Sequence, residues 1–208
     1  MWEKNNQTTL HFSAQEGHCS VIEELLKSKA NIYDMDTDGE IPSHEAALNG
    51  HKDAAKELLE IGADVNFVDN RKQTVLPDAT NVEHCDVTKE IEESISSVAD
   101  INVVNGDGKT PLHLATCNGF INAVKLLLNN GADVNIMDSN NCTALHDAVN
   151  CEKHDVMTEL LNFNADVNAK DSIGDMPLHI ARRLEDEAAV NILINHGATT
   201  HANVHEQS

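Results

Sequence analysis

The chain has 208 residues, enough for one compact domain or one short repeat array. Its formal net charge of −21, from 35 acids against 14 lysines and arginines, argues against binding to nucleic acids and to anionic membrane surfaces, both of which attract basic proteins. No apolar run approaches the ~18 residues that a membrane span needs.

Cysteine usage and the opening residues predict a reducing compartment. The five cysteines are irregularly spaced and odd in number, which favours free thiols over a disulfide framework. The stretch MWEKNNQTTLHF lacks the basic segment followed by an apolar one that marks a secretory signal. We therefore expect a cytoplasmic or nuclear location. With aromatic residues at only 3%, the core must be built from Leu, Ile, Val and Ala.

One short pattern recurs along the chain. TTLHFSA, IPSHEAA, TPLHLAT, TALHDAV and MPLHIAR place histidines at positions 11, 44, 113, 146 and 179. Neighbouring histidines are 33 residues apart, except across the gap between His44 and His113, which spans 69. That gap holds a sixth, degraded copy, TVLPDAT, in which Pro77 takes the histidine position and three extra residues precede the next copy.

A period of about 33 residues with T-P-L-H-x-A is typical of ankyrin repeats. The sequence resembles the ankyrin-repeat family over nearly its whole length, and the match is specific in GDGKTPLHLATCNGFINAVKLLLNNGADVN. The resemblance implies one domain, an all-α-dominated repeat solenoid whose units are a helix–turn–helix plus a β-hairpin or turn. The repeats fall at approximately 3–35, 36–68, 69–104, 105–137, 138–170 and 171–203, and residues 204–208 form a tail.

Repeat 3 departs most from the pattern. Besides Pro77, Lys72 replaces the turn glycine and Glu83 replaces the helix-ending glycine. Because the stability of a repeat array is roughly a sum of repeat and interface terms, a poor central repeat should be the loosest joint. Repeat 3 is therefore either a hinge or a repeat whose sequence has drifted without consequence. Hydrogen exchange in residues 75–97 that is as slow as in 110–130 would contradict the hinge.

Repeat 4 illustrates why these residues build the unit. Thr110 is suited to cap a helix that begins at Pro111, where a missing N–H costs nothing. Gly119 can end that helix in the left-handed conformation, and Gly131 ends the second helix. The family resemblance implies that His113 hydrogen-bonds locally, tying the turn to the helix.

Two patterns in repeats 4 and 5 could signal chemistry instead. Gly108, Lys109 and Thr110 read G-K-T, but a phosphate loop needs a glycine at position 103, which holds valine. Cys142, His146, Cys151 and His154 are zinc-ligand types, yet their C-x3-H-x4-C-x2-H spacing matches no zinc-finger pattern. No serine–histidine or cysteine–histidine pair has catalytic spacing. We therefore expect no enzyme activity, no cofactor and no bound metal.

Repeat 6 and the tail leave the end of the array open. Val190, Ile192, Leu193 and Ile194 keep its last helix apolar, so its outer face is not fully capped. The tail, HANVHEQS, is short and polar. Either the chain is a complete small protein, or further repeats or another domain followed.

The family resemblance implies that hairpin tips and first helices line a concave face that binds other proteins. The position before each hairpin Asp or Asn holds Met35, Val68, Val104, Met137 and Lys170, so four of five are apolar. We interpret them as a binding stripe, and the alternative is that neighbouring hairpins cover them. The remaining candidate contacts are Thr37, Asp38, Glu40, Leu48, Asn49, Arg71, Gln73, Asn81, Asp107, Lys109, Cys117, Asn118, Asn140, Cys142 and Ile173.

The resemblance also suggests a modification. In animal cells, ankyrin asparagines can be hydroxylated where a leucine lies eight residues before and Asp-Val directly precedes them. Asn66, Asn135 and Asn168 fit that pattern. The alternative is that they are purely structural turn residues.

The sequence therefore predicts a monomeric, non-catalytic protein-interaction module acting as an adaptor, scaffold or inhibitor. Its charge favours a partner protein with a basic or mixed-charge surface. The alternative is a secreted microbial or viral effector that binds host proteins in the host cytoplasm. A composition rich in Asn, Ile, Lys and Asp gives this alternative weak support, because it is typical of an AT-rich genome.

Overall fold

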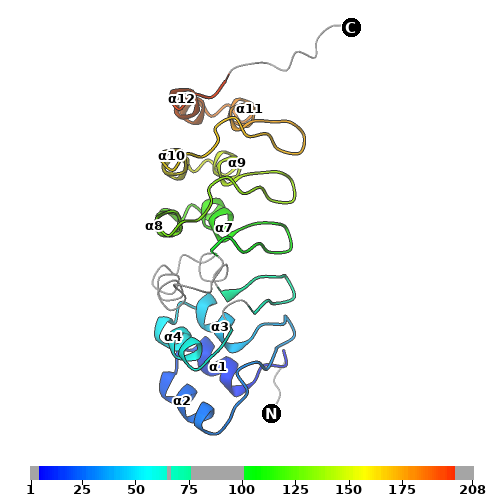
Figure 1. Ribbon diagram of the computed structural model, residues 1–208, viewed down its shortest axis with the longest axis vertical. Helices are drawn as coiled ribbons and strands as arrows, with labels where there is room; N and C mark the ends of the chain where they lie inside the picture. Colours follow the sequence, from blue (N-terminus) through cyan, green and yellow to red (C-terminus); the bar gives the residue numbers. More distant parts are fainter. Residues whose placement is uncertain (1–4, 65–66, 76–100, 200–208) are drawn as a thin grey trace.

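A computed structural model describes residues 5–64, 67–75 and 101–199 of the chain. Helix pairs stack along one axis, and a loop projects sideways from each layer (Figure 1). The helices in chain order are α1 (Thr9–Gln15), α2 (Cys19–Lys27), α3 (Pro42–Leu48), α4 (Lys52–Glu60), α7 (Pro111–Asn118), α8 (Ile121–Asn129), α9 (Ala144–Asn150), α10 (His154–Asn162), α11 (Pro177–Arg183) and α12 (Glu187–Asn195). The predicted helical repeat solenoid is confirmed.

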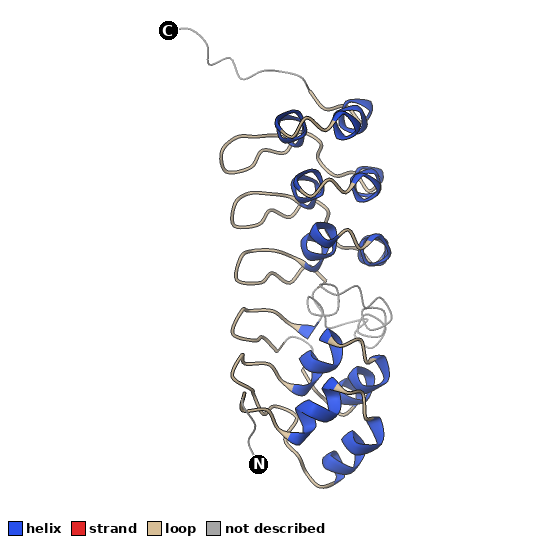
Figure 2. Cartoon of the chain, turned by 180° about the vertical axis from the view of Figure 1, so that it is seen from behind, coloured by secondary structure: helices blue, strands red, loops and turns tan. Residues whose placement is uncertain are grey.

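Each layer has the same internal order. In the C-terminal half, the first helices α7, α9 and α11 lie next to the projecting loops, and the second helices α8, α10 and α12 lie on the far side (Figures 1 and 2). No β-strand occurs in the described ranges, so the loops are hairpin-shaped turns (Figure 2). We call them fingers and number them by the repeat that each opens, so the turns of the second to sixth fingers span 36–40, 69–73, 105–109, 138–142 and 171–175.

The helix boundaries follow the residues that predicted them. Thr110 is the N-cap of α7, and its hydroxyl accepts a hydrogen bond from the backbone N–H of His113 at 3.4 Å. Pro111 is the first helical residue, and Gly119 ends the helix in the left-handed conformation with φ 76°. The local chemistry of repeat 4 is therefore as predicted.

Leucine, isoleucine, valine and alanine form the core, as the scarcity of aromatic residues required. Leu112, Leu127, Leu145 and Leu160 are fully buried in one cluster that runs through repeats 4 to 6. A second cluster, which includes Leu10 and Leu58, fills repeats 1 and 2. Burying such a side chain contributes roughly 1.5–3 kcal/mol, and each cluster includes residues of more than one layer.

The repeated histidines do more than the predicted local tie. The backbone N–H of Thr110 donates to Nδ1 of His113 at 3.2 Å, so the ring proton lies on Nε2. Nε2 then donates to the carbonyl oxygen of Cys142, in the next finger, at 3.1 Å. His11, His44 and His146 make the equivalent bond to a carbonyl 29 residues ahead. Each of these histidines therefore joins two repeats.

Several predictions concern residues outside the described ranges. Pro77, Asn81, Glu83 and the three-residue insertion belong to them, so the hinge in repeat 3 stays a prediction. Lys72, which is described, does adopt the left-handed conformation expected of the glycine it replaces, with φ 60°.

At the C-terminal end of the stack, Leu184 and Ile194 are exposed, whereas Leu193 is buried. None of the helices in the described ranges is both long and apolar enough to span a membrane.

Candidate protein-binding surface

One side chain organises each finger turn. The Oδ1 atom of Asp36 accepts hydrogen bonds from the backbone N–H groups of Asp38 and Glu40, two and four residues on. Asp69, Asn105, Asp138 and Asp171 repeat this arrangement, and the ten bonds measure 2.7–3.0 Å. A polar residue at this position therefore gives every finger the same shape.

Backbone hydrogen bonds lock neighbouring fingers together. The N–H of Asn70 donates to the carbonyl of Asp38 at 3.0 Å, and the N–H of Gly106 donates to that of Arg71 at 2.9 Å. The same bond joins the next two fingers, from Ser139 to Asp107 and from Ser172 to Asn140. Because all fingers share one shape and one stacking bond, equivalent side chains lie in a row.

That row presents apolar side chains. Met35 is 53% exposed, Val68 49%, Val104 46% and Met137 48%. About half of each of these residues is therefore exposed. We call these four residues the apolar stripe. Ile173, at a different position on the last finger, is 77% exposed.

The other candidate contacts divide by their position in the finger. Thr37, Asp38, Asn49, Arg71, Asp107, Asn118 and Asn140 are exposed, whereas Leu48 and Cys117 are partly buried. Asn81 lies outside the described residues.

Glu40 and Gln73 do not lie on an open surface as we expected. Both are buried, and the carbonyl oxygen of each accepts the hydrogen bond of a repeated histidine. Lys109 and Cys142 share this position and are partly buried. The histidine pattern could have predicted this, since the carbonyl 29 residues ahead is the same finger position in every repeat.

Lys109 turns inward to a carboxylate of the next repeat. Its Nζ lies 2.8 Å from Oδ2 of Asp147, on α9, and 3.8 Å from Oδ2 of Asp138. The Asp147 hydrogen bond and charge raise the pKa of Lys109 despite the opposing effect of burial. Lys109 of repeat 4 therefore supplies a positive charge to the buried acids of repeat 5.

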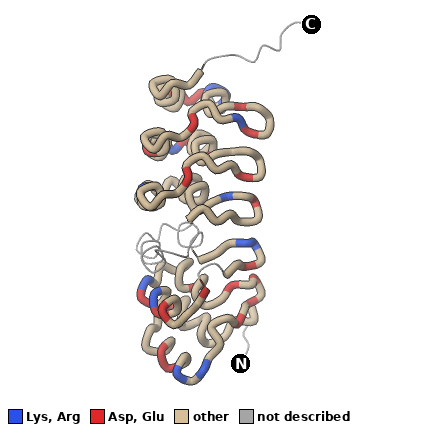
Figure 3. Tube along the Cα trace, in the orientation of Figure 1, with Lys and Arg blue, Asp and Glu red and all other residues tan. Residues whose placement is uncertain are grey.

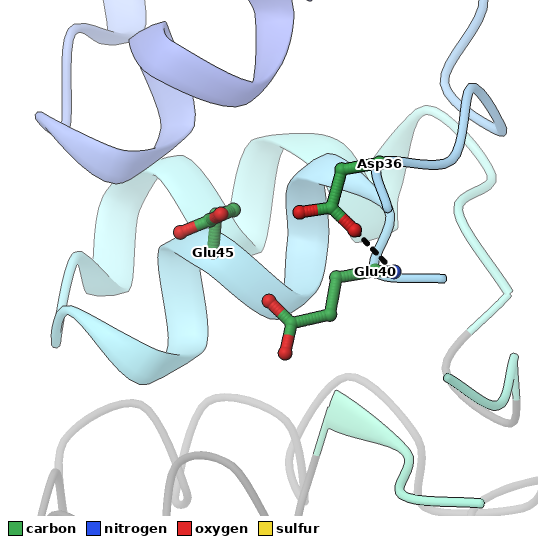
Figure 4. Close-up of side chains that lie close together, drawn as sticks. All are labelled: Asp36, Glu40 and Glu45. Carbon is green, nitrogen blue, oxygen red and sulfur yellow. Dashed lines mark hydrogen bonds between the residues drawn. The ribbon is translucent and has the colours of Figure 1, made fainter. Parts of the chain in front are cut away.

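An acidic pocket of about 370 Å³ lies at the base of the second and third fingers, lined by Asn5, Gln7, Asp36, Asp38, Glu40, Glu45, Leu48 and Arg71. The carboxylates of Asp36, Glu40 and Glu45 converge within 4.8 Å of one another (Figure 4). Acids also gather on the second finger in the charge view, while basic residues mark the third (Figure 3). Among described residues, only this trio of potential metal ligands converges so closely.

Burial perturbs these carboxyl groups. It raises the pKa of Glu40 from 4.5 to about 7, helped by the nearby charges of Glu45, Asp36 and Asp69 and opposed by Arg71. Burial is also the main cause of the raised pKa of Glu45. Burial therefore disfavours the ionised form of both carboxyl groups.

The two histidines among the four zinc-type side chains of repeat 5 have other partners. Nδ1 of His146 accepts a hydrogen bond from the backbone N–H of Thr143, and its Nε2 donates one to the carbonyl oxygen of Asp175. His154 Nε2 lies 2.7 Å from Oδ2 of Asp186, in the next repeat. Burial raises the pKa of the Cys142 thiol to about 11. A group of three or more converging ligands that includes these side chains does not occur in the described structure.

Two hydroxylation candidates make inter-repeat bonds. Oδ1 of Asn135 accepts from the N–H of Asp166, and Oδ1 of Asn168 accepts from that of Thr199, both at 2.8 Å. Both side chains thus have a structural role. Asn66 lies outside the described residues. Hydroxylation stays a prediction, which intact-mass analysis of the native protein would test.

Comparison with known proteins agrees with this geometry. The sequence model of one family, described as ankyrin repeats (3 copies), matches residues 2–69 and 76–171. No curated protein matches the chain.

Proposed function

Because the chain belongs to the ankyrin-repeat family, whose repeats are general protein–protein interaction modules and typically non-catalytic, we propose that it binds a partner protein through its fingers and first-helix ends. The observation that carries this proposal is the apolar stripe. Four half-exposed apolar side chains stand in register on four stacked fingers. Scattered exposed apolar residues need no explanation, but a regular row fixed by hydrogen bonds offers a partner a continuous contact.

The expected contribution of the stripe can be bounded. Covering the exposed half of each side chain is worth about 1 kcal/mol. Replacing Met35, Val68 and Met137 by serine should then lower the affinity for the partner roughly 100-fold. The changes should leave folding intact, because these side chains contribute little to the core.

The far side of the stack supplies a matched control. Val21, Ile61 and Ile194 are also 40–52% exposed and lie in or at the end of second helices. Serine at these three positions removes a similar apolar area without touching the fingers. Partners would be captured from lysates at low and moderate salt, identified by mass spectrometry, and their dissociation constants measured for all three proteins.

Loss of binding in the finger variant alone supports the proposal. Equal binding by the finger variant and the wild type would refute it. Binding that is lost only in the control variant would show that the partner contacts the second helices instead. Since the net charge is −21, we expect the partner surface to be basic or mixed and its association to slow as salt rises.

The source of the partner separates the two finer proposals. A cytoplasmic or nuclear adaptor, scaffold or inhibitor would capture proteins from its own cell. A microbial or viral effector would capture host proteins in preference to its own. Sedimentation of the isolated chain would test the monomer expected from its strong like charge.

A further inference from the structure

We infer that the apolar stripe binds an extended segment of the partner in the polyproline II conformation. The segment has an apolar side chain at every third residue and an acidic residue at the end that lies over the sixth finger. This inference rests on the proposed function, because the segment belongs to the protein that docks on the same fingers. It adds the backbone form and the charge of that segment.

The stripe is a regular row even where the sequence is not. Val68 and Val104 lie 36 residues apart in the chain, whereas the other neighbours in the stripe are 33 apart. The third and fourth fingers are nevertheless joined by the same stacking bond as the others, from the N–H of Gly106 to the carbonyl of Arg71. Packed helices lie roughly 8–10 Å apart, so the side chains of the stripe repeat at about that distance along the column of fingers (Figure 1).

This repeat distance selects the backbone conformation of the bound segment. Three residues of polyproline II rise about 9.3 Å and return the side chain to the same face. In a β-strand, two residues rise only about 6.7 Å and four rise about 13 Å, so neither step matches. Seven residues of an α-helix rise about 10.5 Å, but their row drifts by about 20° at each step and leaves a straight line within four contacts.

The shape and polarity of the fingers also suit a thin, extended chain. Each stripe residue is only about half exposed, so the row is a shallow surface. Polyproline II has no internal hydrogen bonds, and its backbone groups therefore need water or polar partners. Thr37, Ser139 and Asn140 are exposed polar residues on the finger turns beside the stripe and can supply such partners.

Charge distinguishes the two ends of the row. Lys170 holds the stripe position on the sixth finger; it is exposed and forms no ion pair within the described part of the chain. An apolar side chain placed over it would remove water from the ammonium without replacing it, whereas a carboxylate would pair with it. At the other end, Asp38 is exposed on the second finger and also has no ion pair among the described residues. A segment with an acid at one end and a base at the other therefore has one preferred orientation along the row.

A second copy of this chain is a poorer occupant of the stripe. The net charge of −21 opposes the association of two copies. A partner segment that carries its own acid and base avoids this repulsion.

Synthetic peptides test the segment directly. The probe has leucine at every third position, proline and glutamine between the leucines, lysine at one end and glutamate at the other, and it is made in both chain directions. Fluorescence anisotropy with the intact protein measures its dissociation constant. We expect saturable binding in one direction, and binding at least about tenfold weaker when the same residues are rearranged to place leucine at every second or every fourth position. A helix-forming peptide with leucine at every seventh position should be weaker by a similar factor.

Protein variants locate the bound peptide. The finger variant should lose the probe, and the control variant with serine on the second helices should bind it like the wild type. Lys170→Glu should weaken the probe about fivefold and should prefer a peptide with arginine in place of the terminal glutamate. Lys29→Glu, which reverses an exposed charge just beyond α2, should change the affinity by less than about twofold.

Several results would overturn the inference. They are an absence of binding in both directions, equal binding of the rearranged peptides, and tighter binding of the helical peptide. Equal binding of the two charge forms of the peptide by Lys170→Glu would overturn it as well. Self-association in sedimentation that the finger variant abolishes would assign the stripe to a second copy instead.

Failure of this inference is distinguishable from failure of the proposed function. A captured partner that is lost in the finger variant, while no extended peptide binds, would leave the proposed function standing and exclude the extended segment. A captured partner that binds the finger variant normally would remove the proposed function, even if the peptide still binds the stripe of the wild type.

Discussion

Removing the charge of Glu40 should stabilise the protein at high pH and not at low pH. The carboxylate is nearly buried, and its pKa is raised from 4.5 to about 7, primarily by burial. Glu40→Gln keeps an oxygen that can accept the hydrogen bond from Arg71 but cannot ionise. The variant therefore isolates the free energy of holding this charge in the folded state.

The sign and size of this change in stability follow from the linkage between proton binding and folding. Between pH 4.5 and 7 the folded protein binds more protons at Glu40 than the unfolded chain does, so stability is present below that window and lost as pH rises through it. A shift from 4.5 to about 7 corresponds to a loss of about 2 kcal/mol between pH 5 and pH 8, allowing for solvent that reaches the pocket. The glutamine variant should not show this loss.

The assay is urea unfolding of wild type and variant at pH 5 and pH 8, followed by circular dichroism. The difference in unfolding free energy between the two proteins should shift by about 2 kcal/mol in favour of the variant at pH 8. For Glu187→Gln, which removes an exposed acid of repeat 6, the same difference in unfolding free energy should shift by less than about 0.5 kcal/mol. A shift for Glu40→Gln no larger than this control would refute the reasoning.

Two further pairs of variants test the scaffold by urea unfolding. His113→Ala removes a buried side chain that joins the Thr110 cap to the next finger, and should lower the unfolding free energy by about 2–3 kcal/mol. His179 lies partly exposed in the last repeat, so His179→Ala should lower it by less than about 1 kcal/mol. Similar costs would show that the inter-repeat bond contributes little. Gly108→Ala places a methyl group 2.8 Å from the backbone nitrogen of Ser139 at φ 77°, and should cost more than about 2 kcal/mol. Gly174→Ala, at φ 86° with nothing within 4 Å, should cost about 1 from its backbone conformation alone, and equal losses would argue against close finger packing.

The features predicted correctly are those fixed within one repeat. Thr110 and Gly119 act on the backbone directly beside them, so their roles as cap and stop follow from the sequence alone. Met35 and Met137 each precede a turn Asp that fixes the shape of its own finger, which the sequence alone indicates.

The features missed depend on contacts between repeats. Glu40 and Gln73 are both buried, and the carbonyl of each is bonded to a histidine of the preceding layer, His11 and His44 respectively. In the pocket, Glu45 of α3 lies beside Asp36 of the finger turn. The partner of Glu45 is Gln7, 38 residues before it, and no local pattern reveals that contact.

Position 7 decides which partner the Glu45 carboxylate has. The Gln7 amide donates to Glu45, whereas the equivalent residue of repeat 4, Lys109, places its ammonium 2.8 Å from Asp147. Gln7→Lys should therefore raise the stability of the N-terminal repeats, because an ammonium interacts with a buried carboxylate more strongly than an amide does. Urea unfolding of the variant tests this, and an unfolding free energy no higher than that of the wild type would mean that the amide already satisfies Glu45.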